Sequence, residues 1–164
     1  MPIGTATAFH RATELTRDEL LRVAVARGCR HYASLLSANG ETGDDPDLPH
    51  EVLGTALFRG PADAATFQAI RCAAMVLSDL GNSPAAIAEA SRHFGVEHRV
   101  AHIAELGIAA DSHPEFWRAL LDELQVTSQE REFLPGVSRL VADTGLAGRG
   151  RSTAQVWLRT HYRR

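Results

Sequence analysis

Apolar residues recur every three or four positions through most of the chain, a spacing typical of amphipathic helices. The first such stretch follows Thr16 and Glu19, whose separation of three residues fits a capping box. We expect this helix to extend to about Leu36, after a loose lead-in over residues 1–15. Its apolar side holds Leu20, Leu21, Ala24, Val25, Gly28, Tyr32, Leu35 and Leu36, whereas Arg22, Arg27 and Arg30 lie on the opposite, solvated side.

Turn-forming residues divide the next part of the chain into short segments. Residues 37–49 are rich in glycine, proline and acids and predict a solvated loop. A short helix is expected over about 49–59, and a longer one over 61–81. The apolar arc of the longer helix is wide, which predicts a central position covered on several sides. Met75 lies off this arc and is expected to be exposed or part of a partner surface.

Three further helices are marked by their end signals. Ser83 suits the N-cap position of a helix. Gly95 suits the left-handed backbone conformation in which a helix often ends. The chain then restarts as a helix to about Ala110, and a second capping-box pattern at Ser112 and Glu115 predicts the next. The buried side of that last helix holds Phe116, Trp117, Leu120, Leu121 and Leu124.

The C-terminal part has a different pattern. Residues 137–142 fit a helix or a strand, and polar and apolar residues alternate over 154–163, as in a strand. These elements predict a mainly α fold, a compact orthogonal bundle of about six helices with a short C-terminal β-hairpin or strand. We expect a helical domain over 1–148 and a basic segment over 149–164 that belongs to the same domain or forms a dimer arm.

The composition is that of an ordinary globular protein. The chain has 164 residues, of which 45% are hydrophobic and 23% charged. No apolar run approaches a membrane span of about 20 residues, and no secretory signal pattern is visible, so we expect a cytoplasmic protein without a membrane partner. Cys29 and Cys72 are the only cysteines and are not in CxxC spacing, which argues against a disulfide scaffold and a thiolate zinc site. Both are expected to be small buried residues.

Charge is distributed unevenly along the chain. All 17 basic residues are arginines, which excludes lysine chemistry such as a Schiff base or a P-loop. The net charge of −3 combines −8 over 1–148, from twelve arginines and twenty acids, with +5 over 149–164. Five arginines lie near Trp157, a combination that suits an acidic partner or a nucleic acid. They are Arg149, Arg151, Arg159, Arg163 and Arg164.

The stretch "HFGVEHRVAHIAELG", residues 93–107, has three interpretations. Two helices joined by a glycine resemble a helix-turn-helix, but Ala101 stands where a larger buried residue is usual and the second helix carries acids. His98, His102 and Glu105 share one helix face and would make a metal site if further ligands joined them. Simple helix packing, with these polar groups in solvent, is the third and favoured interpretation.

No catalytic motif is recognised, including GxSxG and GxGxxG in a suitable context. The leading hypothesis is therefore a non-enzymatic helical interaction or regulatory protein that self-associates as a homodimer, with no cofactor. The first alternative is a nucleic-acid-binding protein that uses the arginine-rich segment and a helix-turn-helix-like pair at 83–107. The second is a metal-binding protein or metal-dependent enzyme built on the His98, His102 and Glu105 trio.

Overall fold

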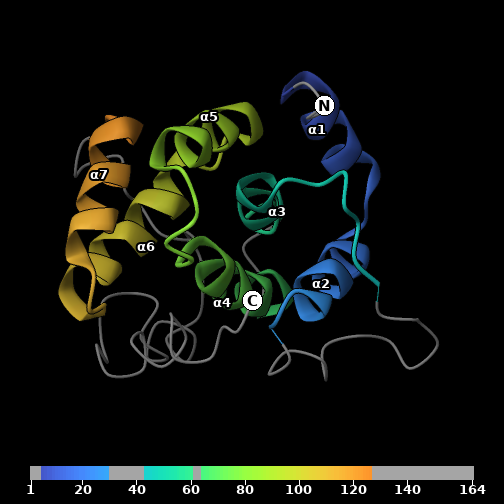
Figure 1. Ribbon diagram of the computed structural model, residues 1–164, viewed down its shortest axis with the longest axis horizontal. Coiled ribbons are helices and arrows are strands. Elements are labelled where there is room, and N and C mark those ends of the chain that lie inside the picture. Colours follow the sequence, from blue (N-terminus) through green and yellow to red (C-terminus); the bar gives the residue numbers. More distant parts are fainter. Residues whose placement is uncertain (1–4, 30–42, 61–63, 127–164) are drawn as a thin grey trace.

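The fold is mainly α-helical, as the sequence predicts. The structure is a computed structural model that describes residues 5–29, 43–60 and 64–126, and these residues contain seven helices and no strand (Figure 1). The expected C-terminal β-hairpin or strand lies outside the described residues. The helices are α1 (Thr5–Glu14), α2 (Arg17–Ala26), α3 (His50–Ala56), α4 (Ala64–Leu77), α5 (Pro84–Phe94), α6 (Glu97–Ala110) and α7 (Pro114–Leu124).

The extra helix relative to the sequence prediction is α1. Residues 1–15 are expected to be a loose lead-in, yet Thr5–Glu14 is helical. Ala8, Phe9 and Ala12 face the core with at most 7% of their surface exposed, and the Phe9 ring stacks on His93 at a centroid distance of 4.2 Å. Packing of this face against the core stabilises a short helix that the sequence prediction missed.

The second helix is shorter than expected. Thr16 caps it as predicted, since its hydroxyl accepts a hydrogen bond from the backbone N–H of Glu19. The helix ends at Ala26 rather than near Leu36, because Gly28 adopts a φ of 132° that breaks the helical path. The predicted apolar side is confirmed for its N-terminal half, where Leu20, Leu21, Ala24 and Val25 are buried.

The centre of the molecule is formed by α3 and α4. Figure 1 shows α3 between α1 and α2 on one side and α5 on the other, and α3 also packs against α4. Gly54 permits this close approach, since a Cβ atom there would lie 2.5 Å from Leu77 Cδ2. The predicted central position of α4 is confirmed by complete burial over 72–77. Met75, expected at the surface, is only 1% exposed because neighbouring helices cover α4 on this side as well.

The other end of the fold is made by α5, α6 and α7. Ser83 caps α5 through Ala86 N–H, and Gly95 ends it at a φ of 68°, both as predicted. The capping box expected at Ser112 is not formed, and His113 is the N-cap of α7 without a side-chain hydrogen bond. His113 precedes Pro114, and the proline ring disfavours helical backbone at that residue, so the helix begins one position later than a box would require.

None of the helices in the described part of the chain is both long enough and apolar enough to cross a membrane.

Candidate functional site

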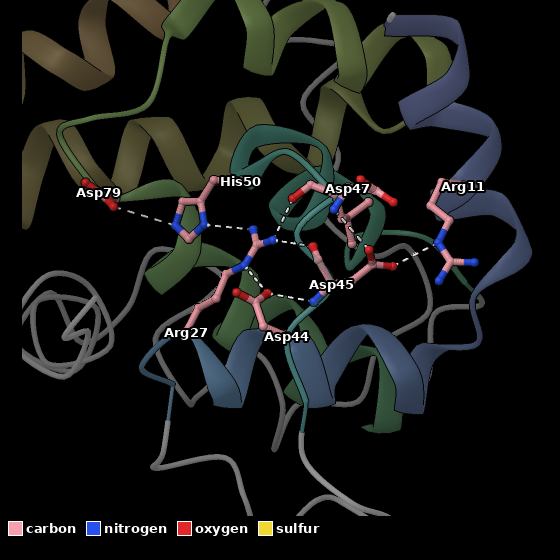
Figure 2. A network of polar contacts seen from close by, with 8 residues as sticks. Arg11, Arg27, Asp44, Asp45, Asp47, His50 and Asp79 are labelled. Carbon is pink, nitrogen blue, oxygen red and sulfur yellow. Dashed lines mark hydrogen bonds and ion pairs between the residues drawn. The ribbon is translucent and has the colours of Figure 1, made fainter. Parts of the chain in front are cut away.

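The most extensive polar network in the described residues is centred on Arg27. Its guanidinium leaves the end of α2 and reaches the loop before α3, where Nε donates to Asp44 Oδ1 at 2.7 Å (Figure 2). Nη2 donates to the backbone carbonyls of Asp45 and Leu48, at 2.8 and 2.6 Å. Nη1 lies 3.4 Å from His50 Nδ1. The sequence pattern places Arg27 on a solvated face, but its side chain is only 12% exposed.

His50 extends this network toward the end of α4. Its side chain is 3% exposed, and Nε2 lies 3.7 Å from Asp79 Oδ2. Arginine can only donate hydrogen bonds, so Nδ1 must accept from Arg27 and the ring proton of neutral His50 belongs on Nε2, on the side of Asp79. The imidazole therefore joins the start of α3 to the residues that follow α4.

The acidic loop has a second arginine partner at its outer side. Arg11 Nε of α1 donates to Asp45 Oδ2 at 2.8 Å, and this hydrogen bond raises the pKa of Arg11 (Figure 2). Asp45 Oδ1 accepts from the backbone N–H of Asp47. The carboxylates and arginines thus hold the 43–49 loop against α1 and α2. Sequence reasoning misses this network because its members come from segments that are far apart in the chain.

The two cysteines meet in the core between α2 and α4. Cys29 and Cys72 are both fully buried, which confirms the prediction made from the sequence. A hydrogen bond with the Cys29 thiol, together with burial, raises the pKa of Cys72 well above its usual value. Two solvent-inaccessible thiols are a packing unit rather than an exposed nucleophile.

The predicted metal ligands all lie on α6. His98 is exposed, and His102 and Glu105 are partly exposed. Among the residues that the structure describes, no group of three histidine, cysteine, aspartate or glutamate side chains is arranged to hold a metal ion. The structure therefore adds no further ligand to this trio, and the metal hypothesis gains no support from it.

The helix pair at 83–107 has the connection expected of a helix-turn-helix, but its second helix is largely enclosed. Ala101, which stands where a larger buried residue is usual, is fully buried, as are Val100 and Ala104. Arg99 turns back to the body of the protein and donates to the carbonyls of Phe58 and Gly60. A recognition helix presents an exposed face to a DNA groove, so this burial argues against DNA reading by α6.

The outer face of α7 carries three acidic side chains, Glu115, Asp122 and Glu123, together with one arginine, Arg118, and we call it the α7 acidic face. All three acidic residues are exposed, and none of their carboxylates forms an ion pair with another described residue. The opposite side of the helix is buried through Trp117 and Leu120. The predicted arginine-rich segment, with Arg149, Arg151, Arg159, Arg163, Arg164 and Trp157, lies outside the described residues.

Comparisons with protein-family models, with curated proteins and with solved structures give no match for this chain.

Proposed function

We propose that the protein is a non-enzymatic interaction or regulatory protein that self-associates, with the arginine-rich segment 149–164 of one copy bound to the α7 acidic face of another. The observation that carries the proposal is the set of three exposed carboxylates without ion-pair partners in the described chain. They stand on the last described helix of a chain whose first 148 residues carry −8 and whose last 16 carry +5. Opposite charges of this kind steer association and set its register.

Two-fold symmetry suits this arrangement. In a reciprocal dimer each copy offers both an arginine-rich segment and an acidic face, so two equivalent contacts form. Exposed ion pairs contribute little individually, and binding strength then depends on several contacts acting together. The association is therefore expected to depend strongly on salt.

The test is the oligomeric state of the full-length chain by light scattering. We expect a dimer at about 50 mM salt that dissociates as salt approaches about 500 mM, where charges are screened within a few ångströms. Replacing the five segment arginines with glutamine should give a monomer, whereas replacing them with lysine should retain most of the association. A monomer at every concentration and salt would refute the proposal.

The alternative target of the segment is a nucleic acid. Arg159 lies beside Trp157 and His161 in the sequence, and arginines beside aromatic residues suit phosphate contact and base stacking. Binding to a mixed DNA and RNA pool at low salt, lost with the five glutamines but unaffected by neutralising the α7 acidic face, would support this alternative. Absence of binding at low salt would exclude it.

A further inference from the structure

Two adjoining pockets open beside Arg59 and Gly60, where α3 gives way to the next segment. The larger, of about 310 Å³, is lined by Arg59, Gly60, Phe94, Gly95, Val96 and Arg99. The smaller, of about 210 Å³, is lined by Leu15, Arg17, Leu20, Ala56, Arg59 and Gly60. Among the residues that the structure describes, every charged side chain that lines either pocket is an arginine.

Arg99 is fixed in place by the backbone at one edge of the larger pocket. Its Nη1 donates to the carbonyls of Phe58 and Gly60, at 2.5 and 3.1 Å, which holds the guanidinium across the end of α3. Its Nε and Nη2 have no hydrogen-bond partner among the described residues. Desolvation by burial lowers the pKa of Arg99. A partly desolvated guanidinium that lacks a carboxylate gains most from a bound anion.

Arg59 provides the second positive charge. Its guanidinium lies over the Phe94 ring, 5.4 Å from the centroid, and it forms no ion pair with the described residues. This contact with an aromatic ring orients the side chain without using its hydrogen-bond donors. Arg59 therefore keeps its full donor set for a ligand in the pocket that it shares with Arg99.

The N-terminal end of α6 closes the same pocket. Gly95 and Val96 line it, and no side chain caps the helix that follows. The backbone N–H groups of a first helical turn and the helix dipole both favour a negative charge at this end. Glu97 is the one acid in this turn, and it does not line the pocket.

We propose that this pocket binds a phosphate group, held by Arg59, Arg99 and the N-terminal end of α6. A doubly charged tetrahedral oxyanion matches two guanidinium forks and a helix N-terminus better than a single carboxylate does. The volume is at the lower end of the range for small-ligand sites, which suits phosphate or a small phosphomonoester. The proposal uses no residue of segment 149–164, so it does not depend on the proposed self-association.

Calorimetric titration of the full-length chain with inorganic phosphate at low, constant ionic strength tests the site. We expect saturable binding that Arg59→Gln weakens about tenfold or more, since a charge-assisted contact is lost. Arg59 donates no hydrogen bond within the described chain, so this variant should keep its fold, which circular dichroism would verify. Arg118→Gln, which removes an exposed arginine on α7, is the matched control and should bind as the parent does.

Competition then identifies the source of the phosphate. Displacement by glycerol 3-phosphate but not by a short single-stranded DNA would indicate a small phosphomonoester, and displacement by both would indicate that a polynucleotide phosphate also enters the site. Either result supports a phosphate site provided that Arg59→Gln weakens it. Three results would overturn the proposal: no saturable binding, unchanged affinity in Arg59→Gln, or an equal loss in Arg118→Gln.

Discussion

At the scale of single residues, several polar side chains in the described part of the chain donate to backbone carbonyls at or just beyond the ends of helices. Asn82, 6% exposed, donates to the carbonyls of Val76 and Leu77 at the end of α4. Arg99 donates to the carbonyls of Phe58 and Gly60, just beyond the C-cap of α3, and Arg92 reaches the carbonyl of Glu123 near the end of α7. Terminal carbonyls lack intrahelical partners, and cationic donors also complement the negative end of the helix dipole. Arg92 thus acts as a capping residue for α7 that is supplied from a distant segment.

The Arg27 network gives a first prediction. Arg27→Met removes the hydrogen bonds to the Asp45 and Leu48 carbonyls and to Asp44. The Asp44 carboxylate keeps the N–H of Asp45 and the Asp45 carbonyl keeps the N–H of Leu48, but the charged donor that joins all three groups is lost. We expect urea unfolding to show a loss of about 2–4 kcal/mol, the range for buried hydrogen bonds to a charged group. Arg27→Lys should recover only part of it, because one ammonium cannot reproduce the forked geometry.

The exposed Arg11 is the control for this prediction. Arg11→Met also removes a contact with the loop, through Asp45, but its side chain is 44% exposed and solvent compensates for the loss. Its effect on stability should be clearly smaller than that of Arg27→Met. Equal effects of the two substitutions would mean that the buried carbonyl contacts do not contribute.

The thiol pair gives a prediction about pH. The pKa of Cys72 is raised in the folded protein, by the hydrogen bond with Cys29 and by burial, so folding favours the protonated thiol. The resulting stability is fully present below the unfolded thiol pKa of about 8.5 and is lost as pH rises above it. Thermal unfolding from pH 7 to pH 10 should therefore show a falling midpoint that Cys72→Ala makes less steep. If the slope of the unfolding midpoint against pH were unchanged by Cys72→Ala, the Cys72 thiol would not be the cause of the pH dependence.

At the scale of whole elements, the sequence predicts helices with strong end signals and misses those whose form depends on tertiary contacts. Ser83, Gly95 and Thr16 mark helix boundaries correctly because capping is local chemistry. The end of α2 depends on the positive φ of Gly28 and on the hydrogen bonds of Arg27 to the 43–49 loop, and neither is visible in the hydrophobic periodicity. The burial of Met75 could not be predicted from periodicity either, since the number of helices covering α4 is a property of the assembled fold.

The packing of α6 on α7 supplies a prediction at this scale. A Cβ atom at Gly107 would overlap the Trp117 ring, which is fully buried and tied through Nε1 to Asp111 Oδ2 at 2.6 Å. Gly107→Ala should therefore destabilise the protein by about 1–3 kcal/mol through overpacking, despite the better helix propensity of alanine. Gly43→Ala is the control, because a Cβ atom there meets nothing within 4 Å. Chemical denaturation of both variants measures the difference, and similar stabilities would show that the two helices can separate freely.

At the scale of the whole molecule, the distribution of charge was readable from the sequence but its placement was not. Composition shows an acidic body and a basic end, and only the structure shows that three of the acids stand together on the outer face of α7 without ion-pair partners in the described chain. The arginine pocket was likewise hidden, since Arg59 and Arg99 come from segments separated by forty residues. Local sequence patterns do not indicate that the three acids, or the two arginines, lie close together in the fold.

The proposed reciprocal dimer makes a prediction that separates binding between copies from binding within one chain. A variant with glutamine at the five segment arginines lacks the cationic partner, and a variant with Glu115→Gln, Asp122→Asn and Glu123→Gln lacks the acidic one, so each alone should be monomeric. In an equal mixture, the intact arginine segment of one variant meets the intact acidic face of the other, and one of the two symmetric contacts is restored. Sedimentation should then show a heterodimer that is weaker than the parent dimer.

Glu89→Gln, an exposed neutralisation on α5, is the control and should dimerise normally. A mixture that stays monomeric while the parent chain dimerises, or an α7 variant that dimerises alone, would place the contact elsewhere.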